Sequence, residues 1–299
     1  MEKQNTLGKR RQQSVNRAAA VFLFPVMLVL VVFIFYPIFD SFRISLEKWN
    51  GISADRVFIG LNNWKKLIAD RSFWLAFRNN VVIMILSIVI QLPLGLAEAT
   101  FIEFAGRKAK ACKIFWFIPM LMSSVAIGFL FTYALAANGG MISAISNFFG
   151  GKNIDLLGNP RTALFTVIGV IAWQFIPFYM VYCMAAYTNI SEDVYEAARI
   201  DGATRGQYFW KIALPLLTPS LKSAAILSMV GSLKYFDLIY VMTGGGPGTS
   251  TELMATYMYK KAFSEFNMGY GSTAACGMFI LITAISLITM RVINGKEED

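Results

Sequence analysis

The chain has 299 residues, of which 56% are hydrophobic and only 15% charged, and its mean hydropathy is +0.55. Soluble domains carry about 25% charged residues, so much of this chain is expected to lie in lipid. The absence of His excludes His-dependent metal sites and Ser-His or Cys-His nucleophile pairs. A net charge of +9 would suit nucleic acid as a partner, but in a membrane protein the side on which Lys and Arg lie matters more than their sum.

Six segments are long and apolar enough to cross a bilayer, which takes about 20 mostly apolar residues. In chain order they are 18–39, 81–97, 114–136, 163–187, 223–243 and 270–290. The first has a basic flank like that of a cleaved signal peptide, but its apolar run is too long and no small-residue cleavage site follows, which favours a retained helix. The sequence therefore predicts an all-α integral membrane protein with six transmembrane helices.

The distribution of Lys and Arg predicts the orientation. With the N-terminus inside, the inner segments hold 15 positive residues and the outer segments 11. The long outer loop 40–80 weakens this difference, but the N-terminal tail and the short loops usually dominate. Both termini are therefore expected in the cytosol. The three cysteines, Cys112, Cys183 and Cys276, have no ligand spacing and are expected to be small buried hydrophobic residues.

The longest inner loop, between the fourth and fifth spans, has an ordered pattern from Asn189 onward. Ser191 precedes two acids as a helix N-cap, and Gly202 can end that helix in a left-handed conformation. A second short helix is expected over 207–212, broken by Pro215 and Pro219 before the next span. From this pattern alone, the two short helices could merely anchor the loop among lipid headgroups.

Seven positions of this loop carry a specific spacing: Glu196, Ala197, Ala198, Gly202, Ile212, Leu214 and Pro215. This spacing resembles the EAA loop of binding-protein-dependent ATP-binding cassette (ABC) importers. The resemblance covers about 79–291. The stretches 236–237, 242–247 and 257–263 are similar to carbohydrate-importer permeases of the maltose, lactose and glycerol-3-phosphate type.

The resemblance implies the type I importer permease fold, with a cytosolic coupling helix between spans four and five that docks into an ATPase subunit through the seven positions. It implies a permease core over 77–292 that contains the EAA loop 189–219. The apolar segments and the charge distribution add a cytosolic tail over 1–17, the first helix and outer loop over 18–76, and a second cytosolic tail over 293–299. The implied partners are a second, related permease, two ATPase subunits, which bind ATP and Mg²⁺, and an extracytoplasmic sugar-binding protein. By the same resemblance, the chain itself is expected to bind no cofactor and to lie in the cell membrane of a bacterium or archaeon.

No catalytic constellation is visible. The glycine cluster 244–248 lacks the Lys-Ser/Thr and the preceding strand of a phosphate loop, so it is interpreted as a flexible outer turn. ATP hydrolysis is therefore expected in another polypeptide, and this chain is interpreted as a transport subunit rather than an enzyme.

Polar residues inside spans are candidates for a substrate path. Spans two, three and four each contain a proline, Pro93, Pro119 and Pro177, which suggests broken helices that line a cavity. Amides and hydroxyls suit the hydroxyl groups of a sugar, and aromatic rings suit its C–H faces. The candidates, which by the resemblance fall at or beside sugar-contact positions of maltose-type permeases, are Gln174, Phe178, Ser228, Ser232 and Tyr235. The same residues could instead pack helices together or form interface belts.

Two alternatives to sugar import remain. The same architecture could import glycerol-3-phosphate or a related phosphorylated polyol, for which Lys234 in the fifth span is weak support. A membrane-embedded enzyme or ion-coupled carrier would need paired intramembrane acids or His, and only Asp237 is present there. Lys234 and Asp237 are three residues apart and are interpreted as a structural ion pair.

Overall fold

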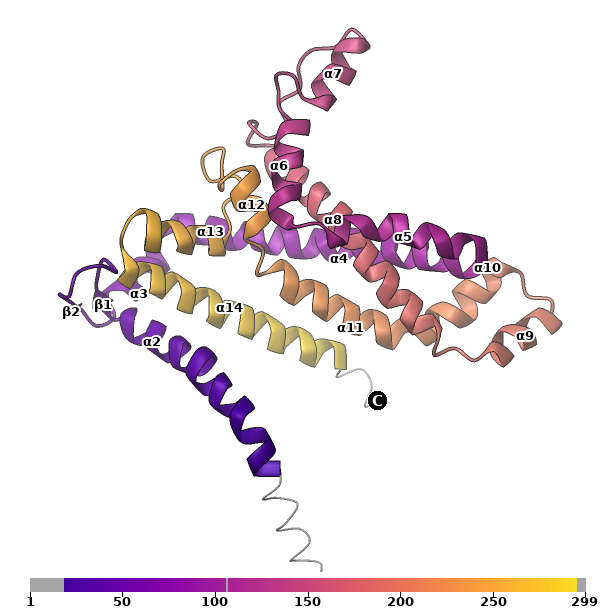
Figure 1. Cartoon of the computed structure of the whole chain (residues 1–299), viewed down its shortest axis with the longest axis horizontal. Coiled ribbons are helices and arrows are strands. Elements are labelled where there is room, and N and C mark those ends of the chain that lie inside the picture. Colours follow the sequence, from indigo (N-terminus) through magenta and orange to yellow (C-terminus); the bar gives the residue numbers. More distant parts are fainter. Residues whose placement is uncertain (1–18, 106, 295–299) are drawn as a thin grey trace, which may run out of the picture. The chain divides into compact units, whose positions relative to one another are not determined.

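The computed structural model describes residues 19–105 and 107–294, which are helical apart from connecting loops and one short hairpin (Figure 1). The chain divides into two compact units. One comprises the residues up to 68 together with 261–276, and the other comprises 69–260 and the residues from 277 onward. Five described helices are long and apolar enough to cross a membrane, and a bent helix pair, counted as one span, is the sixth. The prediction of six transmembrane helices is therefore confirmed.

The first unit begins with the span Ala19–Ile44, which contains a π-helical turn, η1 (Val31–Phe35), and α2 (Tyr36–Ile44). The apolar window of this span is entirely unburied within the chain, as expected for a helix that contacts lipid. Strands β1 (Glu47–Lys48) and β2 (Val57–Phe58) then pair antiparallel, and α3 (Asn62–Ala69) follows. The carbonyl of Ser45 accepts hydrogen bonds from Asn63 Nδ2 and Thr273 Oγ1, both at 3.1 Å, so this expected loop region is ordered.

The second unit is organised around α4 (Arg71–Ala105), which contacts both α8 (Ala163–Tyr187) and α11 (Leu214–Ser232). Its 35 residues correspond to about 52 Å at 1.5 Å per residue, longer than the roughly 30 Å hydrocarbon core. A Cβ on Gly95 would lie 2.7 Å from the Cβ of Tyr179, so glycine is what allows α4 and α8 to approach so closely.

The third span is broken, as a proline-containing span was expected to be. Helices α5 (Arg107–Leu121) and α6 (Ser124–Ala134) meet at an angle of 97°. The second and fourth spans are not broken, because α4 and α8 continue through Pro93 and Pro177. Each proline removes only one helical hydrogen bond, and the tight α4–α8 packing holds both helices together. A short helix, α7 (Met141–Phe148), follows the broken span.

The fifth span differs from its expected bounds of 223–243. Helix α11 ends at Ser232, and α12 (Asp237–Met242) begins after a break. Lys234 lies in this break and Asp237 at its end, both exposed, and no ion pair joins them among the described side chains. The break turns both charged side chains away from the packed interior, so the predicted pairing is wrong. The chain continues through α13 (Met254–Tyr259), η3 (Lys260–Ser264) and α14 (Met268–Asn294).

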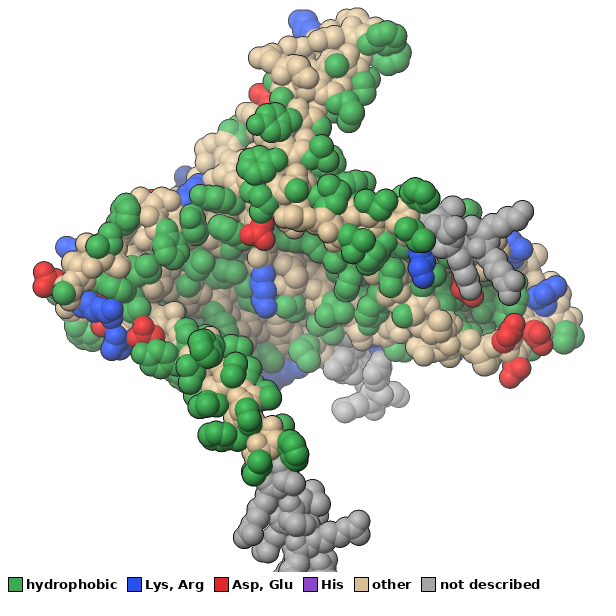
Figure 2. Space-filling view, viewed as in Figure 1, with side chains coloured by type: hydrophobic (Ala, Val, Ile, Leu, Met, Phe, Trp, Pro, Cys, Tyr) green, Lys and Arg blue, Asp and Glu red, His purple; other side chains and the backbone are tan. Residues whose placement is uncertain are grey.

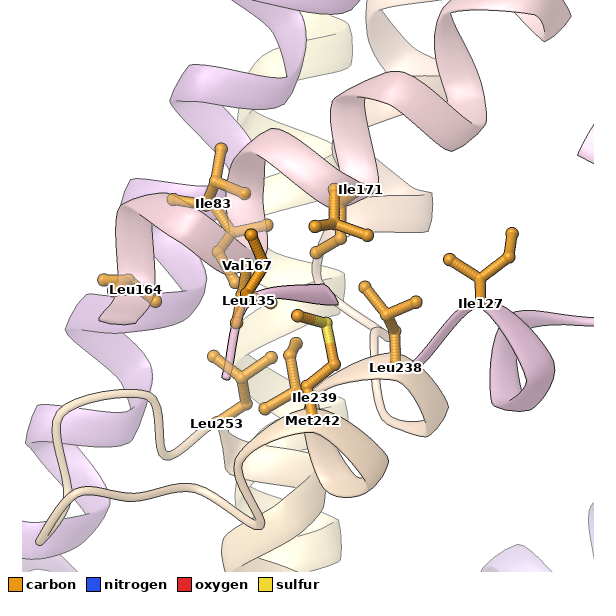
Figure 3. Packing of buried hydrophobic residues seen from close by; sticks show 12 residues of the cluster. Ile83, Ile127, Leu135, Leu164, Val167, Ile171, Leu238, Ile239, Met242 and Leu253 are labelled. Atoms are coloured by element: carbon orange, nitrogen blue, oxygen red, sulfur yellow. The ribbon is translucent and has the colours of Figure 1, made fainter. Parts of the chain in front are cut away.

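The main hydrophobic core of the second unit lies where α4, α6, α8 and α12 converge (Figure 3). Val167 and Ile171 of α8 point toward Ile83 of α4 and toward the side chains of α12, and Leu253 closes the cluster from the following loop. Cys183 and Cys276 are buried as expected, with 1% and 3% of their surface exposed. The side chain of Cys112 and the tails 1–17 and 295–299 lie outside the described residues.

Candidate functional site

The first half of the loop between α8 and α11 folds as the sequence predicts. Helix α9 (Glu192–Ile200) starts after Ser191 with acids in its first turn. Gly202 has φ +76° and ends the helix, as predicted. The N–H of Ala203 donates to the carbonyl of Ala198 at 2.9 Å and the N–H of Gly202 to that of Arg199 at 3.1 Å, which together form a Schellman turn.

The second half of this loop corrects the expectation of a short helix ended by prolines. Helix α10 (Arg205–Tyr208) starts with a capping box between Thr204 and Gln207. It continues through a π-helical turn, η2 (Phe209–Ala213), directly into α11, so that Arg205–Ser232 forms one span. Pro215 lies in the first turn of α11, directly after the wider π-helical turn, and Pro219 lies inside α11. Neither proline ends the helix, although each lacks the N–H of a helical hydrogen bond.

One face of the loop packs onto the ends of the spanning helices. Buried Ala198, Tyr208 and Ala213 contact a cluster contributed by α4 and α8. The Tyr208 ring lies edge-on to Phe104 of α4 at 6.1 Å and to Tyr195 of α9 at 5.0 Å between ring centroids. Helix α9 is therefore fixed to α4 through aromatic contacts, and it packs in the same cluster as residues of α8.

The opposite face of the loop is exposed and carries an acidic residue beside two small ones. Glu196, Ala197 and Gly202 are exposed, and no atom lies within 4 Å of a Cβ built on Gly202. Acidic side chains gather over α9 in Figure 2. Of the seven EAA positions, Ala198 is buried, Ile212 and Leu214 are half-buried, and Pro215 is exposed. The motif thus has one face packed against the spanning helices and one exposed face with small side chains.

Four of the five predicted substrate residues lie on α8 and α11, and Tyr235 lies in the break after α11. Gln174, Ser228 and Ser232 are buried, and Phe178 and Tyr235 are half-buried. Gln174 Nε2 donates to Ser124 Oγ at 3.1 Å. Gln174 Oε1 and the hydroxyl oxygens of both serines have no hydrogen-bond partner among the described residues. Such unsatisfied buried groups are rare in a purely structural seam.

The structure brings these residues together only in part. The ring of Phe175, which the sequence placed nearby, lies edge-on to Tyr235 at 5.6 Å, whereas Phe178 packs against Tyr179 at 5.1 Å. Tyr179 lies beside Ser228, but among the described residues their contact does not have the geometry of a hydrogen bond. Phe178 and Gln174 therefore face different neighbours despite their spacing of one helical turn.

Two polar residues of α4 were missed. Ser87 and Gln91 are buried at a spacing of one turn, and Ser87 Oγ and Gln91 Nε2 also lack hydrogen-bond partners. Gln91 and Tyr179 both lie next to Tyr235. Their signal was visible as two polar residues on one face inside the second span. We call the unsatisfied groups of Ser87, Gln91, Gln174, Ser228 and Ser232 the polar seam.

The glycine cluster is an ordered turn rather than a flexible one. Thr251 Oγ1 donates to the carbonyl of Gly246 at 2.7 Å. Asn79 Nδ2 of α4 lies within hydrogen-bond distance of three carbonyls of the turn, at 3.0–3.3 Å. Asn80 Nδ2 donates to the carbonyl of Leu233, and Asn80 Oδ1 accepts from the N–H of Met254. The turn is thus attached to α4.

Comparison with known proteins identifies relatives over most of the chain. The family model "Binding-protein-dependent transport system inner membrane component" matches residues 91–296. The "Probable ABC transporter permease protein YurN" of Bacillus subtilis is 33% identical over 283 residues, covering 93% of this chain and 97% of YurN. The "Trehalose/maltose transport system permease protein MalF" of Thermococcus litoralis is 30% identical, covering 96% and 97% of the two chains.

A solved structure shares the fold. It is that of a bacterial alginate ABC transporter in complex with an alginate pentasaccharide-bound periplasmic protein. One of its chains matches with a TM-score of 0.82 and 20% identity, covering 93% of this chain and 94% of the other. The predicted importer permease fold is therefore confirmed.

Proposed function

Because the chain belongs to the family of binding-protein-dependent transport system inner membrane components, we propose that it is the permease subunit of an ATP-driven importer of a sugar or oligosaccharide. The cargo is proposed from relatives named for trehalose and maltose, for multiple sugars and for sulfoquinovosyl glycerol. The polar seam supports this cargo, since it offers amides and hydroxyls next to aromatic rings. Its five residues include no cation, which favours a sugar over a phosphorylated polyol.

The two-faced loop is the observation that carries the proposal. In our interpretation the outer face, with Glu196, Ala197 and Gly202, docks into a separate ATPase subunit that holds ATP and Mg²⁺. The inner face, through Ala198 and Tyr208, passes the movement to α4 and α8. Closure of the ATPase dimer would then switch the spans between inward-open and outward-open states as a rigid-body movement. Ile212, Leu214 and Pro215 would fix the register between the docked helix and α11.

The proposed assembly contains this chain, a second related permease, two ATPase subunits and an extracytoplasmic binding protein. The alginate transporter crystallised with its periplasmic protein supports the last of these. The loop between α8 and α11 then lies in the cytosol together with both termini, and the loops at the other end of the spans receive the binding protein. Gln174, Phe178, Ser228, Ser232 and Tyr235 are the proposed sugar contacts, joined by Ser87 and Gln91.

Gly202→Asp tests the coupling role. Gly202 and Gly139 both have left-handed backbones, at φ +76° and +78°, and neither has an atom within 4 Å of a built Cβ. Gly139→Asp therefore adds the same charge and similar strain outside the loop. We expect Gly202→Asp in proteoliposomes to abolish sugar uptake while ATP hydrolysis persists, because the aspartate blocks docking. Gly139→Asp should leave the number of sugar molecules imported per ATP hydrolysed unchanged, because a weaker contact with the binding protein would lower uptake and stimulated hydrolysis together. Normal uptake by Gly202→Asp would refute the coupling role.

A further inference from the structure

The loop that carries α9 contains a small pocket lined by two arginines. The pocket has a volume of about 280 Å³ and lies between α9 and α10. Arg199, in the last turn of α9, and Arg205, the first residue of α10, both line it. Ala203 lines it as well and directly follows Gly202 in the chain. The arginine pocket is therefore next to the face that we propose to dock into the ATPase subunit.

The two arginines of this pocket have no anionic partner. Among the described side chains, no ion pair includes Arg199 or Arg205. The Arg199 guanidinium lies over the ring of Tyr195, with its Cζ 5.9 Å from the ring centroid. The carboxylates of Glu103 and Glu192 line a neighbouring pocket instead. Because two cations in one small pocket repel each other, an anion between them replaces repulsion with attraction.

The backbone around the pocket also favours an anion. Arg205 begins a continuous helical span of 28 residues, whose positive dipole end therefore lies at Arg205. The N–H groups of Arg205 and Gly206 donate to no described residue. At the end of α9, by contrast, the N–H groups of residues 201–203 already donate to the last carbonyls of that helix, so these carbonyls are not free acceptors.

The size of the pocket limits what the anion can be. Small-molecule sites commonly measure about 300–1,000 Å³, so this pocket suits a single side chain better than a nucleotide. The planar guanidinium group of arginine binds a carboxylate through two parallel hydrogen bonds. The side chain of an aspartate or a glutamate therefore fits the pocket in charge, shape and size.

The charges of the surrounding segment favour a protein over a membrane surface as the source of this anion. Residues 192–205 carry four acids and two arginines, a net charge of −2. The negative surface of an anionic leaflet would repel such a segment. A protein surface with separate acidic and basic groups can instead match both the arginine pocket and the acidic side chains that Figure 2 shows over α9.

We infer that the arginine pocket receives a carboxylate side chain of the ATPase subunit, held by Arg199 and Arg205. The inference rests on the proposed function and names the chemistry that the partner presents beside Gly202. Glu196 on the exposed face and the two arginines in the pocket then fix the orientation of the docked helix, because a reversed helix would place like charges against each other.

The test measures how tightly the ATPase subunit binds. Both full-length permeases are reconstituted together in nanodiscs, and a fluorescently labelled ATPase subunit is titrated onto them to obtain its Kd. Because the second permease presents its own loop, the weaker of the two binding steps is compared. The variants of this chain are Arg199→Gln and Arg205→Gln. Lys211→Gln is the matched control, since Lys211 is an exposed cation of the same loop that does not line the pocket.

We expect Arg199→Gln and Arg205→Gln each to raise the Kd about tenfold, the effect of losing hydrogen bonds between charged groups. Arg199→Lys keeps the charge but loses the paired hydrogen bonds, so its Kd should lie between those of Arg199→Gln and the wild type. Lys211→Gln should leave the Kd unchanged. Unfolding temperatures equal to that of the wild type would show that the variants are folded.

A charge swap identifies the partner group. Each exposed acid of the ATPase subunit is replaced in turn by arginine, and each product is titrated onto the Arg199→Glu permease. One of these ATPase variants should bind Arg199→Glu about tenfold more tightly than the wild-type ATPase does, because the swap restores a pair of opposite charges.

Three results would contradict these expectations in distinguishable ways. If both glutamine variants bind the ATPase with the wild-type Kd, the inference is wrong and the proposed function stands. If the glutamine variants weaken binding only when the nanodiscs contain anionic lipid, the pocket holds a lipid headgroup and the inference is also wrong. If the wild-type permeases bind no ATPase subunit at all, the proposed function itself is refuted.

Discussion

At the scale of single residues, the glycine turn depends on one close approach. A Cβ on Gly245 would lie 2.7 Å from a carboxylate oxygen of Glu252, and Gly245 has φ +89°. Glu252 is only 3% exposed and forms an ion pair with Lys260. Glycine at this position therefore gives the buried carboxylate its space.

Gly245→Ala and Gly248→Ala form a matched pair that tests this contact. Both positions have a left-handed backbone, but no atom lies within 4 Å of a Cβ on Gly248. Each alanine is expected to cost about 1–2 kcal/mol of backbone strain. Gly245→Ala should cost a further 1–3 kcal/mol, roughly, because it overpacks the Glu252 site. Thermal unfolding in detergent should thus show a lower Tm for Gly245→Ala, and equal Tm values would contradict the assigned contact.

The two glycine positions also show what the sequence can predict at this scale. Gly202 follows a capped amphipathic helix, so its left-handed conformation follows from local pattern and is confirmed. The order of the 244–248 turn depends on Asn79 and Glu252, one of them about 170 residues away. A contact between residues so far apart in the sequence cannot be predicted from a local pattern, and a run of glycines alone resembles a flexible loop.

At the scale of elements, the apolar pattern predicted the ends of a span correctly where polar residues flank the helix. The fourth span was predicted at 163–187 and is observed as Ala163–Tyr187. Proline content was a poorer guide, since α4 and α8 continue through Pro93 and Pro177. The polar seam was predicted in part: Gln174, Ser228 and Ser232 were candidates, whereas Ser87 and Gln91 were missed. The contact of Tyr235 with Phe175, outside the seam, depends on the break after α11.

Tyr208 tests how α9 is joined to the spans. Its ring contacts both Phe104 and Tyr195, and its hydroxyl makes no hydrogen bond within the described part of the chain. Tyr208→Ala would leave a cavity that costs about 3–5 kcal/mol locally and would loosen α9 from α4. We expect fewer sugar molecules imported per ATP hydrolysed, measured in proteoliposomes. Tyr208→Phe keeps the ring and should behave as the wild type; a loss of coupling in that variant would show that the hydroxyl, not the packing, matters.

At the scale of the whole molecule, α4 connects two distant parts of the second unit. Near its start, Asn79 and Asn80 hold the glycine turn and the segment before α13. Near its end, Ala99 and Ile102 pack against the loop that carries α9. A movement imposed on α9 would therefore reach the glycine turn through one continuous helix, past the polar seam. This arrangement is consistent with alternating access at a site between the two ends.

This account requires α9 and α7 to lie on opposite sides of the membrane, which cysteine labelling can measure. Lys152 and Arg205 are both exposed. Cys183 and Cys276 are buried, so Lys152→Cys and Arg205→Cys can each be labelled in a Cys112→Ser background. A membrane-impermeant maleimide should label Lys152→Cys in right-side-out vesicles, and Arg205→Cys only after the vesicles are permeabilised. The background chain without an added cysteine controls for labelling of the buried thiols. Labelling of Arg205→Cys in sealed vesicles would place α9 outside, where ATP is scarce, and the ATPase-docking role would be untenable.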